Sequence, residues 1–322
     1  MTRLSPRTKA ILSLAAAAIL PVAFAISSPG GGVPLPTESE RLSQLAGKAM
    51  EGGGSLAWLL LTVAILVCVA IWRRERRASL PFLEITSAPC STPRVALLTF
   101  TWVVGQAVAG LLVGMPYSAS GKGADVQSFA LTIALVWALG TVLGLFVPLW
   151  LLVQGRLPKA QRLGIRLPQR GKEFVWGFLA FLTFPALVFI GISLTSLIRK
   201  FNPLETNPVF AGALSSTSPA EWMLLFVVVC VLGPVVEEFL FRGLLYRSLR
   251  DLWKPLPAMA IGGVFFSVIH PSVMTLLPLA FLGMVLAYLY ERTSSLVPGM
   301  VAHGLYNTST LAAVFWLQHV AA

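Results

Sequence analysis

Long apolar runs recur along almost the whole chain and limit the folds that it can adopt. A helix needs roughly 20 apolar residues to cross the hydrocarbon core of a bilayer. Runs near this length lie at about 10–27, 55–72, 95–115, 128–152, 174–198, 220–241, 257–270, 274–290 and 296–318. Only 11% of the 322 residues are charged and 56% are hydrophobic, a composition far from that of a soluble domain. We therefore predict an all-α fold, a polytopic transmembrane helical bundle of about eight or nine spans.

The basic residues are spread between the apolar runs instead of forming one patch. The formal net charge of +11 could indicate nucleic acid as a partner, but a positive-inside distribution explains the pattern better. We therefore expect the lipid bilayer as a partner and no nucleic acid. Cys68, Cys90 and Cys230 have no paired spacing, which argues against a disulfide framework and against a cysteine zinc motif.

The basic loops also predict how the chain is oriented. Basic residues are concentrated in 73–77, 154–173 and 242–254, and counting spans from an inner N-terminus puts all three segments on one side. We expect this side to be the cytoplasm, because short loops rich in Lys and Arg stay there. The protein is then integral and multi-pass, and we expect it in the inner membrane of a bacterial cell.

The same runs predict the organisation of the chain. Residues 1–150 form an N-terminal transmembrane region, residues 151–173 a basic cytoplasmic linker, and residues 174–322 a membrane core. The first span is either an uncleaved anchor or a signal peptide, because "AFA" at 23–25 is similar to a signal peptidase site. We find no internal repeat and no soluble catalytic domain in the sequence, so any chemistry has to use residues in the spans.

Ionisable and amide side chains are concentrated in the apolar runs of the last third of the chain. Insertion of an ionisable side chain at the centre of a membrane helix costs roughly 2.5–3.5 kcal/mol of free energy, so each such residue requires an explanation. The group consists of Glu237, Glu238, Arg242, His270, His303 and Asn307. The first five runs carry almost no residues of this kind, so we expect the functional site in the last third.

The two adjacent glutamates have different surroundings on a helix. Glu238 and Arg242 are at positions i and i+4, so they lie on one face and can neutralise each other. Glu237 points about 100° away and has no such partner, because the residue four positions later is Phe241. An unpaired carboxylate in a low-dielectric place is a candidate general base. We therefore predict a structural role for Glu238 and a reactive one for Glu237.

Two histidines share an i, i+4 spacing with another side chain. Phe266 precedes His270 by four residues and His303 precedes Asn307 by the same interval, so each pair lies on one helical face. Each feature alone has a structural explanation, since polar side chains in membrane helices often bond a neighbouring backbone. Together with the glutamates they favour a functional site, although an ion or proton pathway would use the same residue types.

At these residues the chain resembles the CAAX prenyl endopeptidases of the Rce type and their bacterial relatives, the CPBP intramembrane proteases. That family carries Glu-Glu-x-x-x-Arg, then Phe-x-x-x-His, then His-x-x-x-Asn/Asp on successive transmembrane helices. Here the motifs read "EEFLFR" at 237–242, "FSVIH" at 266–270 and "HGLYN" at 303–307. The resemblance covers about 220–315 and implies that residues 174–322 form a CPBP-type protease core.

The resemblance also implies a role for each motif residue. Glu237 and His270 would position and activate an attacking water. His303 and Asn307 would bind the oxyanion of the tetrahedral intermediate. Structural support of the site would come from Glu238, Arg242 and Phe266.

The sequence leaves open whether a metal takes part. Members of the family are often labelled metalloproteases, and Glu237, His270 and His303 would be the ligands if zinc is present. The chain has no His-Glu-x-x-His or His-x-x-x-His segment, the usual way to place two ligands on one helical face. We therefore favour no metal and no other cofactor, with zinc as the alternative.

These features predict an intramembrane endopeptidase that hydrolyses a peptide bond of a membrane-associated or C-terminally tailed protein or peptide. Water activated by glutamate and histidine would be the nucleophile. One alternative is a non-proteolytic membrane scaffold or immunity factor of the same family, which keeps the motifs as a polar core. A transporter is less favoured, because transporters usually show matching repeats and here the polar residues lie in one half of the chain.

Overall fold

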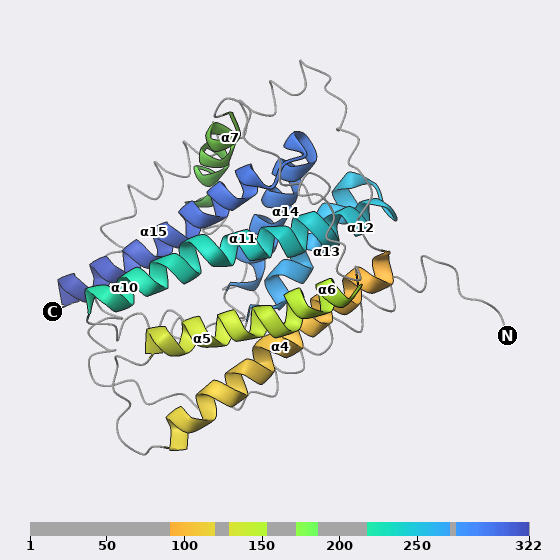
Figure 1. Ribbon diagram of the computed structural model, residues 1–322. Coiled ribbons are helices and arrows are strands. Elements are labelled where there is room, and N and C mark those ends of the chain that lie inside the picture. The colour runs from red at the N-terminus through yellow and green to blue at the C-terminus, as the bar shows by residue number, and fades with distance from the viewer. Residues whose placement is uncertain (1–90, 120–128, 153–171, 186–217, 271–274, 322) are drawn as a thin grey trace, which may run out of the picture.

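The computed structural model describes residues 91–119, 129–152, 172–185, 218–270 and 275–321 (Figure 1). All regular elements in these ranges are helices, which confirms the all-α class for this part of the chain. Three of the described helices are long and apolar enough to cross a membrane, at 131–150, 219–250 and 276–293. The predicted spans at 10–27 and 55–72 lie outside the described residues, so the total number of spans stays a prediction.

The first two described helices form an antiparallel pair, α4 (Thr92–Ala119) and α5 (Phe129–Thr141) (Figure 1). α5 continues through a π-helical turn, η2 (Val142–Phe146), into α6 (Val147–Leu152). A polar contact joins the pair, because Gln106 Nε2 donates a 3.0 Å hydrogen bond to Thr141 Oγ1. Several large apolar side chains are exposed on these helices, among them Trp150 of α6, as expected for a surface that meets lipid.

The predicted span at 174–198 does not begin as one uninterrupted helix. α7 (Lys172–Phe181) gives way to a turn at 182–183. Thr183 donates both its N–H and its Oγ1 hydrogen, the latter at 2.7 Å, to the carbonyl of Ala180. Pro185 follows, and proline lacks an N–H and disfavours helix in the residue before it. The predicted span therefore contains a turn at 182–183, and its part after Pro185 lies outside the described residues.

A continuous helical segment, residues 219–250, lies at the centre of the described bundle (Figure 1), and we call it the central rod. Its parts are α10 (Pro219–Leu225), η4 (Phe226–Leu232), α11 (Gly233–Glu238), η5 (Phe239–Tyr246) and α12 (Arg247–Arg250), where η marks π-helical turns. The rod begins at a capping box: Ser218 Oγ accepts from the N–H of Glu221, and the Glu221 carboxylate accepts from the N–H of Ser218. It continues past 241, the predicted end of this span.

The rod extends so far because its second half is core. All eight residues of η5 are buried, and α4, α13 (Pro255–Val268) and α14 (Leu276–Thr293) pack against this turn. The last helix, α15 (Val297–Ala321), runs along η4 and α11 and contacts α7 on its other side. Burying a continuous apolar surface on several neighbours stabilises the rod more than helix propensity alone.

α13 and α14 cross with their backbones in direct contact. A Cβ at Gly283 would lie only 2.6 Å from the Cα of Gly263, so the pair of glycines sets how closely the helices approach. The predicted break at His270 is confirmed, since α13 ends at Val268 with Ile269 as its cap. α14 ends at Ser294, whose left-handed φ of 50° closes the last turn.

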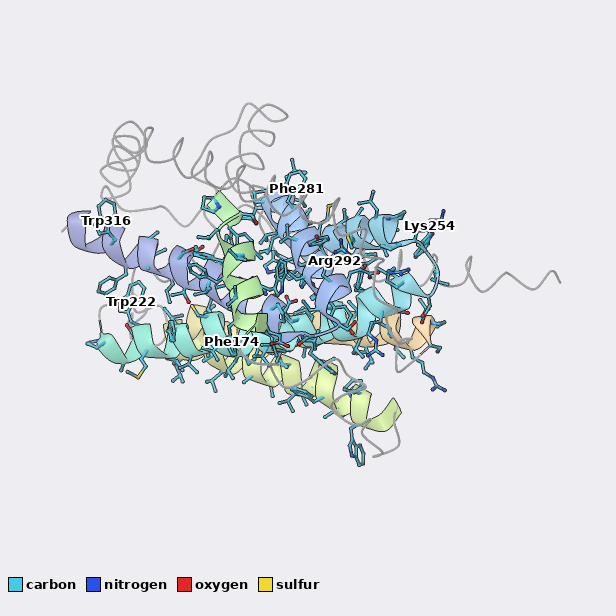
Figure 2. All side chains as sticks on the ribbon, turned by 90° about the horizontal axis from the view of Figure 1, so that it is seen from above. Phe174, Trp222, Lys254, Phe281, Arg292 and Trp316 are labelled. Atoms are coloured by element: carbon cyan, nitrogen blue, oxygen red, sulfur yellow. The ribbon has the colours of Figure 1, made fainter. Side chains whose placement is uncertain are left out.

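The two ends of the bundle differ in chemistry. Trp222 and Trp316 lie at one end, and Lys254 lies at the opposite end, next to the end of the central rod (Figure 2). The Trp222 ring packs edge-on against Phe315 at a centroid distance of 5.0 Å. Trp at the ends of a bundle and basic residues concentrated at one end are typical of helices that span a membrane.

Candidate active site

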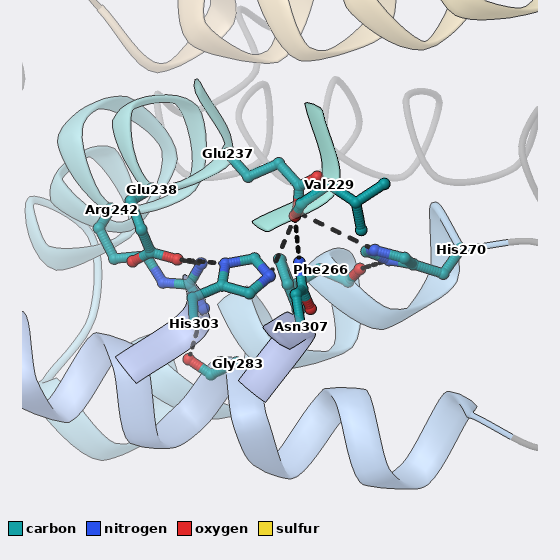
Figure 3. A network of polar contacts seen from close by, with 9 residues as sticks. All are labelled: Val229, Glu237, Glu238, Arg242, Phe266, His270, Gly283, His303 and Asn307. Carbon is teal, nitrogen blue, oxygen red and sulfur yellow. Dashed lines mark hydrogen bonds and ion pairs between the residues drawn. The ribbon is translucent and has the colours of Figure 1, made fainter. Parts of the chain in front are cut away.

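The structure brings together the residues of all three motifs from three separate helical segments (Figure 3). Glu237 and Glu238 lie in α11, and Arg242 lies one turn later in η5. The others come from α13 and the residues just after it, and from α15: Phe266, His270, His303 and Asn307. Residues that are 70 positions apart in sequence, such as Glu237 and Asn307, therefore line one place in the bundle.

Glu238 and Arg242 form the ion pair that their spacing predicts. Arg242 Nη1 donates to Glu238 Oε1 at 2.7 Å, and the two side chains are only 2% and 1% exposed. Arg242 Nη2 also donates to the carbonyl of Gly283 at 3.1 Å. The guanidinium lies 4.7 Å from the centre of the Phe266 ring, a cation–π distance. The pair thus connects the central rod with α13 and α14.

Glu238 has a second partner that the spacing does not predict. His303 Nδ1 lies 3.2 Å from Glu238 Oε1, the same oxygen that accepts from Arg242. α15 passes close to this carboxylate, because a Cβ at Gly299 would lie 2.6 Å from Glu238 Oε2. The absence of a side chain at Gly299 is therefore what lets His303 reach the pair.

His270 is held by the end of its own helix. The N–H of His270 donates to Ser267 instead of Phe266, which leaves the Phe266 carbonyl without its usual helical donor. His270 Nδ1 lies 2.8 Å from that carbonyl. The Phe266 ring packs against both imidazoles, at 5.1 Å from His270 and 5.5 Å from His303. Phe266 therefore fixes His270 through its backbone carbonyl and contacts both histidines with its ring.

Glu237 faces both histidines. Its Oε2 lies 4.0 Å from His270 Nε2 and 3.8 Å from His303 Nε2, and this oxygen is buried with no hydrogen-bond partner among the described residues. The side chains of Glu237 and His270 are 15% and 25% exposed, whereas that of His303 is 3% exposed. Glu237 and His270 thus form the accessible side of the site, and His303 lies behind them.

Asn307 is engaged by the backbone of the central rod. Its Nδ2 donates a 2.8 Å hydrogen bond to the carbonyl of Val229. In the π-helical turn η4, the N–H of Gly233 donates to Val228, and the next residue, Pro234, has no N–H to offer Val229. The carbonyl that the proline leaves without a donor is therefore satisfied by Asn307. One of the two amide hydrogens of Asn307 remains for another acceptor.

Replacement of Asn307 by leucine should leave the Val229 carbonyl unsatisfied. We expect Asn307→Leu to lower the free energy of unfolding by about 1–3 kcal/mol, the cost of an unpaired buried acceptor. Thermal unfolding in detergent measures this loss. Ser309→Ala, an exposed neighbour on α15, is the matched control and should unfold like the wild type. An unchanged midpoint for Asn307→Leu would show that the amide does not stabilise the rod.

The arrangement does not fit a zinc site. Two ligands of a tetrahedral zinc ion, each at about 2.0–2.1 Å, are about 3.3 Å apart. Glu237 Oε2 is farther than that from each histidine, and no group of three His, Cys, Asp or Glu side chains within the described ranges is arranged to hold a metal ion. One water that bonds two acceptors at about 2.8 Å with a tetrahedral angle keeps them about 4.5 Å apart, so the separations found lie between the zinc and the water values.

Comparisons with known proteins point to the same segment. Residues 219–309 match the family described as type II CAAX prenyl endopeptidase Rce1-like. A protein of Bacillus subtilis (strain 168) named "Putative membrane peptidase YdiL" is 31% identical over 85 residues, which are 26% of this chain and 35% of that protein. The alignment thus spans about a third of the length of this curated relative. No solved structure matches the chain. Residues 219–309, which contain all three motifs, are thus similar to the CPBP family of Rce1-like membrane proteins.

Proposed function

We propose that this protein is an intramembrane endopeptidase that hydrolyses a peptide bond with a water activated by Glu237 and His270. One observation carries the proposal: Glu237 Oε2 faces the Nε2 atoms of both His270 and His303, at 4.0 and 3.8 Å. A water with two hydrogens suits such a place, because it can donate to two of these atoms. The match to an endopeptidase family and to a protein named as a membrane peptidase supports this reading.

The proposed reaction uses the accessible side of the site. Glu237 accepts a proton from the water, the hydroxide oxygen attacks the scissile carbonyl carbon, and His270 orients the water through Nε2. The oxyanion of the tetrahedral intermediate receives hydrogen bonds from His303 and from the amide hydrogen of Asn307 that Val229 does not use. The C–N bond then breaks, and the proton held by the site passes to the leaving nitrogen.

The surroundings of Glu237 support a substrate with an apolar segment. Val231, Leu232 and Val235, on the same rod, each expose more than 40% of their surface. Such a surface suits a peptide that approaches along the bilayer. We therefore propose membrane-associated or C-terminally tailed proteins and peptides as the substrate class.

Hydrolysis can be tested with purified protein in liposomes and a panel of membrane-anchored peptides, with and without a prenylated cysteine. We expect the wild type to cut members of the panel and, in water enriched in ¹⁸O, to place the label in the new carboxyl group. Glu237→Gln should produce no new termini. If Glu237→Ala restores the phenotype of a deletion strain while it is expressed, the scaffold alternative holds and hydrolysis is not the function.

The absence of a metal requirement is a separate expectation. Activity in detergent should survive prolonged treatment with EDTA or phenanthroline, and the purified protein should contain far less than one zinc per chain. Elemental analysis of the wild type beside His270→Ala measures this. Zinc bound at one per chain and lost in His270→Ala would replace the glutamate mechanism with a metal-assisted one.

We also propose that the site opens toward the cytoplasm, in a multi-pass protein of a bacterial inner membrane. Glu237 lies about 20 Å from Arg250 along the rod at 1.5 Å per residue, nearer to the basic end than to Pro219. Cysteines at 239–249 would be buried and out of reach of a thiol reagent. Ala220 and Lys254 are exposed, one at each end of the central rod. In a cysteine-free background, Lys254→Cys should react with an impermeant thiol reagent only from the cytoplasmic side. Reaction from the outside would reverse this orientation.

A further inference from the structure

The hydrogen-bond partners of the two histidines determine which ring nitrogen carries the hydrogen in each. The Phe266 carbonyl can only accept, so His270 Nδ1, at 2.8 Å from it, is the protonated nitrogen. The Glu238 carboxylate also accepts, so His303 Nδ1, at 3.2 Å, carries the hydrogen as well. In the neutral form of each imidazole, Nε2 then presents a lone pair toward Glu237 Oε2. A neutral His303 in this state cannot donate to an oxyanion.

We infer that Glu238 is a positioning residue of the reaction, which holds His303 as the Nδ1–H tautomer so that His303 Nε2 receives the proton of the attacking water. This inference rests on the proposed function and deepens it. In the resting site, His303 Nε2 is then a proton acceptor and not a hydrogen-bond donor. It becomes a donor only after it has received the proton during the reaction.

The proton and the bonds balance in this sequence. The water transfers one proton, through Glu237 Oε2, to His303 Nε2, while its oxygen forms a bond to the carbonyl carbon. His303 is then an imidazolium whose Nδ1–H faces the Glu238 carboxylate and whose Nε2–H can donate to the oxyanion. When the C–N bond breaks, this proton passes to the leaving nitrogen, and the products are a carboxylic acid and an amine.

The environment of Glu238 suits this role. Its Oε2 is buried without a partner in the described part of the chain, so both of its contacts use Oε1. Arg242 compensates the charge of the carboxylate at 2.7 Å, and Gly299 lets α15 bring His303 within reach. A carboxylate that orients an imidazole through Nδ1–H and stabilises its protonated form is a known solution for nucleophilic hydrolysis.

A paired replacement separates positioning from support of the fold. Glu238→Met with Arg242→Met removes both buried charges together, and apolar replacement of a whole buried pair usually preserves the fold. We expect this double variant to keep a thermal midpoint close to that of the wild type. We expect its kcat to fall by up to about 10,000-fold with KM little changed, the effect of losing the carboxylate that fixes the histidine tautomer in a catalytic triad.

Nitrogen NMR of the two reactive histidines reports their tautomers. If Glu238 only supported the fold, its replacement would leave the His303 tautomer unchanged. The chain has only three histidines, so ¹⁵N-histidine labelling with His319→Gln and His270→Gln assigns His303. In the wild type we expect the Nδ1–H tautomer of His303, retained in Glu238→Asp, and a shift toward Nε2–H in the double variant. A wild-type His303 in the Nε2–H form, or a folded double variant with unchanged kcat, overturns the inference. If the wild type cuts no peptide, the proposed function fails. The tautomer of His303 measured by NMR still tests whether Glu238 holds the Nδ1–H form.

Discussion

Glu237→Gln is expected to reduce the rate of peptide hydrolysis by at least about 100-fold and up to about 10,000-fold, the range for loss of a general base. The amide keeps the shape of the side chain but cannot take a proton from water. The buried oxygen that faces His270 and His303 would then belong to a neutral group. Cleavage rates in liposomes measure the effect.

The thermal midpoint of Glu237→Gln should stay near that of the wild type, because Glu237 Oε2 has no hydrogen bond to lose among the described residues. Asp251→Asn, an exposed carboxylate beyond the end of the central rod, is the matched control and should keep full activity. Retained cleavage by Glu237→Gln, in a preparation free of wild type, would remove Glu237 from the mechanism.

Glu238→Met, unlike Glu237→Gln, should lower the stability of the protein. The single replacement leaves the Arg242 guanidinium, which is 2% exposed, without its carboxylate. An uncompensated charge of this kind costs about 3–5 kcal/mol, so we expect a large fall in the thermal midpoint or in the yield of folded protein. The midpoint should recover when Arg242→Met is added, because no buried charge is then left alone.

The comparison of the single and double variants in thermal unfolding provides the control. Equal midpoints for Glu238→Met and the wild type would mean that the ion pair does not stabilise the bundle. A double variant as unstable as the single one would mean that the contacts of Glu238, including the one with His303, carry the stability, and not the need to compensate the Arg242 charge.

Local spacing was a good guide where the interaction lies within one helix. Glu238 and Arg242 are one turn apart, so their pairing follows from helical geometry alone and is present in the structure. The end of α13 before His270 was also predictable, since a proline follows in the sequence. The resemblance of this segment to the CPBP family was predicted from three short motifs, and the match of residues 219–309 to the Rce1-like family confirms it.

Interactions between helices were beyond what spacing could predict. The motifs place His303 and Glu238 in one site, but they do not predict the contact between them, because it depends on how closely α15 packs at Gly299. The partner of Asn307 was missed for a different reason. In an α-helix, Pro234 would leave the carbonyl of Cys230 without a donor, whereas the π-helical register shifts this effect to Val229. Pro234 in the sequence therefore indicates that one carbonyl of the rod lacks a donor, but not that it is the carbonyl of Val229.

The π-helical turns of the central rod have a consequence for how relatives of this chain are aligned. A wide turn accommodates one more residue than an α-turn, so evolution can insert or delete a single residue in 226–232 without opening a loop. The turn absorbs such a change, so the helical faces on either side keep their orientation relative to Glu237 while the motif itself stays intact. Alignments of this segment should therefore allow a one-residue gap just before Pro234, inside what looks like an unbroken helix.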